Sequence, residues 1–212
     1  MKILITGGNG FVGRNLIKIL EKDYDIYSPS SSQLDLTDEK SVEEYLRNKF
    51  FDVVIHCAIK GGRRNVQDTA FTLQDNLKMF FNLMNNKDRF DRFINFSSGA
   101  DFDKTKNVNM MHHNLEESYP ISPYDMSKNI ISRILKSCQR CYNFRIYGVF
   151  GIDEAEDRFI TSNIKRYKTY YPIEIHQNRY WDFFYIKDLV NIVKYYIDNP
   201  KYDLDNEMDL VY

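Results

Sequence analysis

The sequence has few cysteines and no long apolar run. Its 212 residues include three cysteines, an odd and sparse set that is not a disulfide framework. No apolar stretch approaches the roughly 20 residues of a membrane-spanning helix. The N-terminus also lacks a basic region followed by an apolar signal segment. We therefore expect a cytoplasmic protein with no membrane span.

The sequence also lacks an excess of either charge. Lysine and arginine total 29 against 30 acidic residues, so the formal net charge is −1. This balance gives no reason to expect nucleic acid or a polybasic membrane contact as a partner. Hydrophobic residues make up 43% of the chain, which excludes wholesale disorder and permits a full core.

Metal ligands at a recognised spacing are missing as well. Cys138 and Cys141 form a single C-x-x-C late in a helical pattern, without a second pair at zinc spacing. His112 and His113 are conceivable partners, but the pattern favours two ordinary helix cysteines. We expect no metal site.

Short apolar runs alternate with amphipathic patterns through most of the chain. Strands are expected at 2–6, 24–27, 52–57, 92–96 and 143–147, and helices at 11–21, 38–49, 69–86 and 123–141. After Gly151 the pattern blurs into helices at 153–167 and 187–198 and an extended segment at 173–177. Alternating strands and helices predict an α/β protein with a doubly wound parallel sheet.

Three glycines, Gly7, Gly10 and Gly13, stand at three-residue steps between the first strand and the first helix. Glycine permits a tight turn, lets the backbone approach a pyrophosphate, and lets the helix pack close to the sheet. The helix N-terminus then offers N–H groups and partial positive charge to an anion. A turn that only joins strand to helix is the alternative, but the context favours a dinucleotide cradle.

An acidic residue is absent where NAD would need one. An Asp or Glu about 20 residues after the glycines binds the ribose 2′-hydroxyl of NAD. Residues 28–32 read Ser-Pro-Ser-Ser-Ser instead, so a 2′-phosphate would meet no repulsion. The serine hydroxyls can donate hydrogen bonds to it, and Arg14 can supply charge. The pattern favours NADP(H) over NAD(H), with a plain Ser/Pro turn as the alternative.

Tyr124 and Lys128 are four residues apart in a helical pattern, so both side chains lie on one face. A lysine ammonium nearby favours tyrosinate and lowers the pKa of the tyrosine from about 10. Such a tyrosine can exchange a proton with a sugar hydroxyl or ketone while hydride moves to or from a nicotinamide. A Tyr and a Lys at this spacing also occur in ordinary helices. Ser122 and Pro123 before them favour a functional pair.

Together these motifs resemble the extended short-chain dehydrogenase/reductase family, the NAD(P)-dependent nucleotide-sugar epimerases, dehydratases and reductases. The resemblance implies a Rossmann fold and covers almost the whole chain. Its segments, in family order, are Thr6–Gly13 (TGGNGFVG), Leu34–Asp38 (LDLTD), Val54–Ala58 (VIHCA), Asp75–Lys78 (DNLK), Ile121–Lys128 (ISPYDMSK) and Trp181–Leu189 (WDFFYIKDL).

The resemblance also implies which residues act. Catalysis would fall to Ser98, Tyr124 and Lys128, with Ser98 favoured over Ser97 because Phe102 follows it by four residues, as an aromatic does in the family. Cofactor contacts would come from Gly7, Gly10, Phe11, Val12, Gly13, Asp35, Leu36, Ala58 and Asn76, together with Tyr124 and Lys128. Arg158 and Arg179 are candidates for the substrate diphosphate, although Arg158 also fits a solvated helix charge.

The two residues that directly follow Ser98 indicate which branch of the family the chain resembles. The 4,6-dehydratases carry Asp-Glu there, whereas this chain has Gly99 and Ala100, so dehydration is disfavoured. The AIKGG stretch at 58–62 is similar to the GDP-fucose synthase branch, but the cysteine that this branch uses to epimerise is replaced by Ala100. Reduction at C4, or a 4-epimerase cycle, fits the remaining groups.

The family arginine before D-F-x-Y is Trp181 here, the family asparagine of R-x-x-N-x-Y-G is Gly148, and family members are usually longer. We expect residues 1–148 to form the NAD(P)-binding domain, with 178–198 packing back onto it. Residues 149–177 and 199–212 would form a reduced substrate lobe.

Three functions remain open from the sequence. The first is an NAD(P)-dependent oxidoreductase or epimerase acting on a nucleotide-activated sugar, in surface-polysaccharide assembly. It would form a homodimer through the long helices that hold Asn76 and Tyr124. The second is a catalytically silent NADP-binding sensor, motivated by the shortened C-terminal part. The third is a structural subunit that pairs through the same helices.

Overall fold

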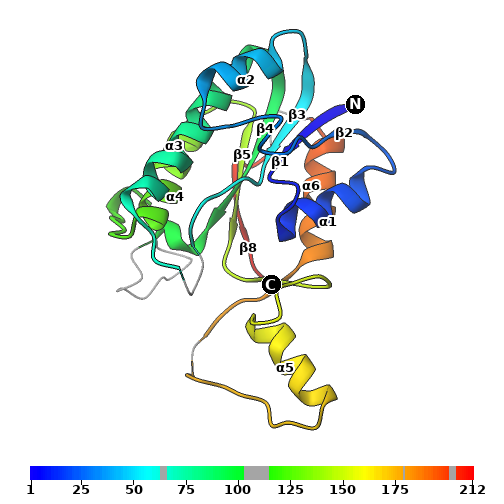
Figure 1. Cartoon of the computed structure of the whole chain (residues 1–212), viewed down its shortest axis with the longest axis vertical. Helices are drawn as coiled ribbons and strands as arrows, with labels where there is room; N and C mark the ends of the chain where they lie inside the picture. Colours follow the sequence, from blue (N-terminus) through cyan, green and yellow to red (C-terminus); the bar gives the residue numbers. More distant parts are fainter. Residues whose placement is uncertain (63–65, 103–114, 179, 201–203) are drawn as a thin grey trace.

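The protein is described here by a computed structural model covering residues 1–62, 66–102, 115–178, 180–200 and 204–212. Its centre is a six-stranded sheet in the order β2-β1-β3-β4-β5-β8, and every neighbouring pair is parallel. Helices cover both faces of this sheet (Figure 1). The predicted doubly wound α/β fold is therefore confirmed.

The elements of the main sheet follow the predicted alternation closely. Its strands are β1 (Lys2–Thr6), β2 (Asp25–Tyr27), β3 (Phe51–His56), β4 (Phe90–Ser98), β5 (Cys141–Ile146) and β8 (Glu207–Leu210). The helices are α1 (Phe11–Leu20), α2 (Glu39–Leu46), α3 (Ala70–Met84), α4 (Pro123–Lys136), α5 (Phe159–Lys168) and α6 (Ile186–Asp198). Short 3₁₀ turns are η1 (Lys87–Arg89), η2 (Gly99–Asp101) and η3 (Leu115–Glu117).

Helices bury both faces of the sheet, and successive residues of a strand point to opposite faces, so neighbouring residues enter different cores. Ile3 and Ile5 of β1 pack in a core with residues of α1 and α6, whereas Leu4 between them packs in a second core with residues of α2, α3 and α4. Strands β1 and β3 therefore carry apolar residues at successive positions, which explains their continuous apolar runs.

A smaller unit lies beyond the carboxyl end of the main sheet. β6 (Val149–Phe150) pairs in parallel with β7 (Phe184–Tyr185), and the chain between them carries α5 away from the body (Figure 1). α5 contributes no buried residue. Residues 173–177, all of them described, form no strand, so the expected extended element is wrong. α5 begins at Phe159 rather than at 153, since Asp153 has φ +71°, which lies outside the right-handed helical region.

The helix that carries Tyr124 is shorter than expected. α4 ends at Lys136, Cys138 lies in the following turn, and Cys141 is the first residue of β5. Arg140 takes φ +61°, which reverses the chain into the strand. The two cysteines are therefore not helix residues, and their Sγ atoms lie 3.0 Å apart.

The end of the chain differs most from expectation. The sequence pattern predicts that residues 199–212 belong to the substrate lobe, but β8 adds to the main sheet beside β5. Its sequence, EMDL, has acidic residues at alternate positions and gives only a faint strand signal. Glu207 and Asp209 instead pair with Arg145 of β5, so a tertiary ion pair holds a strand that the apolar pattern does not reveal.

None of the helices in the described part of the chain is long and apolar enough to cross a membrane.

Candidate functional site

The glycine turn joins the carboxyl end of β1 to the start of α1. Gly7 takes φ +68°, and a Cβ there would lie 2.5 Å from the backbone nitrogen of Ala58. A Cβ at Gly13 would lie 2.5 Å from the carbonyl oxygen of Gly7. The turn is thus compressed between α1 and the segment that follows β3. This place is the topological switch point of the sheet, where α/β proteins of this kind bind ligands.

The side of the turn at Gly10 is open. An added Cβ at Gly10 would meet only the Gly7 carbonyl oxygen, at 3.2 Å, among the described residues. Gly10 is also the N-cap of α1, and within the described chain no side chain caps it. An open helix N-terminus with uncapped N–H groups fits a pyrophosphate. Phe11 and Val12, which follow in the first turn, are half-buried.

The serine run lies beside the glycine turn. A Cβ at Gly8 would meet the hydroxyl oxygen of Ser28 at 2.0 Å, so the end of β2 packs directly against the turn. Arg14 is exposed on α1, where its Nη2 donates to the carbonyl oxygen of Asp153 at 3.3 Å. The structure therefore brings Ser28 to the turn and leaves the Arg14 side chain near the surface of α1.

Asp35 and Leu36 follow the serine run. Leu36 is buried, and its carbonyl oxygen accepts from Asn82 Nδ2 at 2.9 Å. Asp35 is exposed, and hydrogen bonds from Thr37 lower the pKa of its carboxyl. The Asp35 carboxylate therefore stabilises the turn at Thr37 by accepting hydrogen bonds from its backbone and side chain.

Asn76 ties the segment after β3 to two helices. Its Nδ2 donates to Lys60 O at 3.0 Å and to Ser127 Oγ at 3.1 Å, while its Oδ1 accepts from Lys60 N at 2.9 Å. Both amide hydrogens are thus in use within the protein. The Ala58 N–H in the same segment points to Thr6 Oγ1 at 3.4 Å. This geometry gives Asn76 the task of fixing the loop around Ala58.

Ser98, Tyr124 and Lys128 come together at the carboxyl edge of the sheet. Ser98 ends β4, and its Oγ accepts from Ala100 N at 3.2 Å and lies near enough to the Tyr124 phenol to lower its pKa. Lys128, buried one turn further along α4, has Nζ 5.9 Å from the centre of the Tyr124 ring. A Cβ at Gly62 would lie 2.8 Å from that ring, so the loop after β3 covers it.

The start of α4 explains why Tyr124 sits at this edge. Ser122 is the N-cap and its Oγ accepts from Asp125 N at 3.2 Å, and Pro123 occupies the first helical position. Both are strong helix-start residues. They place Tyr124 in the first turn, next to the end of β4.

Burial dominates the protonation of this cluster. It raises the pKa of Tyr124 to about 12, and the hydrogen bond from Ser98 only partly opposes the rise. Burial lowers the pKa of Lys128 to about 8, against the attraction of Asp101. The expectation that Lys128 lowers the tyrosine pKa is therefore wrong here. Lys128 Nζ donates to the carbonyl oxygen of Phe96 at 2.6 Å, and its distance from the ring is too large to offset desolvation.

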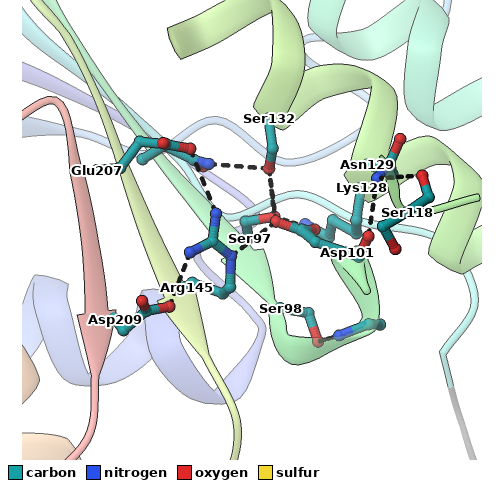
Figure 2. Close-up of polar contacts among 12 residues, drawn as sticks. Ser97, Ser98, Asp101, Ser118, Lys128, Asn129, Ser132, Arg145, Glu207 and Asp209 are labelled. Atoms are coloured by element: carbon teal, nitrogen blue, oxygen red, sulfur yellow. Dashed lines mark hydrogen bonds and ion pairs between the residues drawn. The ribbon is translucent and has the colours of Figure 1, made fainter. Parts of the chain in front are cut away.

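The two serines at the end of β4 point to different surroundings. Ser97 is buried, and its Oγ donates to Asp101 Oδ1 at 2.5 Å and lies 2.8 Å from Ser132 Oγ (Figure 2). Ser98 lies outside this network (Figure 2), where its Oγ accepts from Ala100 N at 3.2 Å and is close to Tyr124. The structure thus separates the two hydroxyls, with Ser98 alone beside the phenol.

Of the two arginines proposed for the substrate, the structure describes Arg158, and it does not bring this residue to the cluster. Arg158 is the N-cap residue of α5, and its Nε lies 3.6 Å from Glu154 Oε1. Arg179 lies outside the described residues. Gly148 and Trp181, the two residues that depart from the family pattern, are in contact. A Cβ at Gly148 would lie 2.7 Å from Trp181 Nε1, so the indole of Trp181 occupies the space that a side chain at position 148 would need.

Sequence reasoning missed the buried charge pair of Asp101 and Arg145 behind Ser98. The sequence did contain a signal for this pair, because Asp101 follows Ser98, the last residue of a largely apolar strand, by only three positions.

Comparison with known proteins covers nearly the whole chain. The profile of a family described as the NAD dependent epimerase/dehydratase family matches residues 3–209. The chain is 26% identical to GDP-L-colitose synthase of Yersinia pseudotuberculosis, over 94% of this chain and 73% of that protein. It is 40% identical to GDP-L-fucose synthase of Azorhizobium caulinodans over 47% of this chain, a match that spans only 33% of that protein.

Solved structures share the fold. A GDP-mannoheptose C4 reductase from Campylobacter jejuni with NADP bound superposes with TM-score 0.82 at 15% identity, over 99% of this chain and 80% of that one. A GDP-L-fucose synthetase from Naegleria fowleri bound to NADP gives TM-score 0.81 at 18% identity, over 100% of this chain and 72% of that one.

Proposed function

Because the chain belongs to the NAD dependent epimerase/dehydratase family, as its motifs indicated, we propose that it reduces or epimerises a nucleotide-activated sugar at C4. The observation that carries the proposal is the contact of Ser98 with Tyr124, with Lys128 one turn away, at the sheet edge that also holds the glycine turn. A bound nicotinamide would supply or accept the hydride, and a side chain of the protein would donate or accept the proton at the sugar oxygen.

Tyr124 suits the role of proton donor. With a pKa of about 12, the phenol stays protonated at neutral pH and can donate to a ketone oxygen. Ser98 would hydrogen-bond the same oxygen. Lys128 sits behind the ring and holds the carbonyl of Phe96, which fixes the end of β4. This arrangement favours reduction of a 4-keto sugar as the main direction, with epimerisation as the alternative.

The glycine turn would hold the cofactor pyrophosphate at Gly10 and the N-terminus of α1. Gly7 and Gly13 have no room for a Cβ, as a close-packed cradle requires, and the backbone of Ala58 lies against Gly7. Asp35, Leu36 and Ala58 would contact the rest of the cofactor. Ser28 beside the turn supports NADP(H) over NAD(H), since no carboxylate occupies residues 28–32. Two relatives are named as synthases of GDP-linked sugars, so GDP-linked sugars are the first substrate class to test.

We expect Arg14→Ala to weaken NADPH binding by about tenfold while NADH binding is unchanged, because a charge-assisted contact to the 2′-phosphate is worth roughly 1.4 kcal/mol. Fluorescence titration with both cofactors measures this. Lys18→Ala, an exposed cation one turn along α1, is the matched control and should leave both affinities unchanged. Equal losses for NADPH and NADH with Arg14→Ala would argue against a 2′-phosphate contact.

The proposed reaction is tested by incubating the protein and NADPH with 4-keto sugars linked to GDP, dTDP, CDP or UDP. We expect NADPH to be consumed with at least one of these sugars, and most rapidly with a GDP-linked one. Cofactor binding without binding or turnover of any nucleotide sugar would instead favour the silent NADP sensor.

We also propose a homodimer through α3 and α4. These helices pack on each other, and α3 leaves Phe71 and Phe81 exposed by 72% and 41%. Apolar side chains of this size on one helix are suited to an interface.

A further inference from the structure

A buried carboxylate stands behind the proposed catalytic groups. Asp101, at the end of η2, is fully buried, and Figure 2 shows side chains from β4, α4 and β5 turned toward it. Its Oδ1 accepts from Ser97 Oγ at 2.5 Å, and its Oδ2 accepts from Ser132 Oγ at 2.7 Å and Arg145 Nε at 3.0 Å. The carboxylate therefore links three elements by short hydrogen bonds.

Arg145 connects this carboxylate to the edge of the sheet. Its Nη1 donates to Asp209 Oδ1 at 2.7 Å and its Nη2 to Glu207 Oε1 at 3.3 Å, both on β8. Burial alone would lower the pKa of Arg145, but the attraction of Asp101 and Asp209 outweighs it, so the pKa is raised. The guanidinium therefore stays charged inside the protein. A buried ion pair adds little net stability, so a gain in conformational specificity is a reason to retain one.

The position of Asp101 couples it to the proposed site. Ser97 and Ser98 are adjacent, and η2 starts directly after Ser98, so the bond from Ser97 to Asp101 fixes the turn that presents the Ser98 hydroxyl. On α4, Asn129 donates to the Asp101 carbonyl oxygen at 2.8 Å, and it is the residue after Lys128. Asp101 thus binds both the strand end that carries Ser98 and the helix that carries Tyr124 and Lys128.

We propose that Asp101, held by Arg145, is a positioning residue that sets the distance between Ser98 and the Tyr124–Lys128 pair. The inference rests on the proposed function, since the positioned groups are the ones that would act on the sugar. Misplacing reacting groups by about 1 Å can cost roughly 100-fold in rate. The carboxylate also acts on Lys128 through space, because its negative charge favours the ammonium.

The test is Asp101→Asn, which keeps the shape and removes the charge. We expect kcat to fall by about 10- to 100-fold with KM for NADPH unchanged, since a displacement of reacting groups by about 1 Å costs rate on this scale. Lys128 faces His56 and Cys57 at the end of β3, Tyr124 on its own helix and Asp101 in η2. Because Asp101 raises the Lys128 pKa, its loss should move the Lys128 titration, followed by NMR without substrate, to lower pH.

Glu207→Gln is the matched control, because it changes an Arg145 partner that does not touch Asp101. It should keep kcat and the Lys128 titration. Should Asp101→Asn fail to fold, Ser132→Ala removes one hydrogen bond to the same carboxylate and should give a smaller loss in the same direction. A folded Asp101→Asn protein with the kcat and Lys128 titration of the wild type would overturn the proposal. Failure of the proposed function looks different, because then the wild type itself turns over no nucleotide sugar while the Lys128 titration still shifts.

Discussion

Substitution of Tyr124 by phenylalanine is expected to reduce kcat by about 10²- to 10⁴-fold, the usual contribution of a general acid. The phenol is the group that contacts Ser98, and its raised pKa of about 12 keeps the proton available at neutral pH. Phenylalanine keeps the ring that packs under the loop at Gly62 but cannot transfer a proton. Affinity for NADPH should therefore remain that of the wild type.

The measurement is steady-state turnover of the nucleotide sugar that the panel identifies, together with NADPH titration and thermal unfolding. Tyr119→Phe is the matched control, since Tyr119 is 72% exposed and its ring stacks against Arg133 rather than the site. It should leave kcat unchanged. Normal turnover by Tyr124→Phe would show that another group supplies the proton.

Substitution of Gly13 by alanine is expected to abolish NADPH binding and to lower the free energy of unfolding by about 1–3 kcal/mol, the usual cost of overpacking. A Cβ at this position would lie 2.5 Å from Gly7 O and 2.9 Å from Gly8 Cα. Backbone atoms cannot step aside as a flexible side chain can, so α1 must move away from the turn. The helix N-terminus would then no longer face the pyrophosphate.

Gly10→Ala separates the two consequences. Its Cβ would meet one described atom, Gly7 O at 3.2 Å, so the fold should keep its stability to within about 1 kcal/mol. The methyl group would instead enter the open space proposed for the pyrophosphate, and NADPH affinity should fall. Urea unfolding and fluorescence titration measure the two effects. Unchanged NADPH binding by a stable Gly10→Ala protein would mean that the glycines form only a turn.

The local parts of the fold were determined by the sequence alone. Strands from β1 to β5, helices α1 to α4 and α6, and the glycine turn were all expected from periodicity and glycine spacing. Such signals depend on residues a few positions apart, such as the Ser122 and Pro123 pair that starts α4. The order of motifs along the chain also identified the family, and the match over residues 3–209 confirms it.

Tertiary structure decided the features that depend on distant residues. β8 joins the sheet because Glu207 and Asp209 meet Arg145, more than 60 positions earlier in the chain. Ser97 turns inward because Asp101 and Ser132 converge on it, which leaves Ser98 for Tyr124. The spacing of a tyrosine and a lysine shows that they share a helix face. Only their burial reveals that desolvation, rather than the lysine charge, sets the protonation of the site.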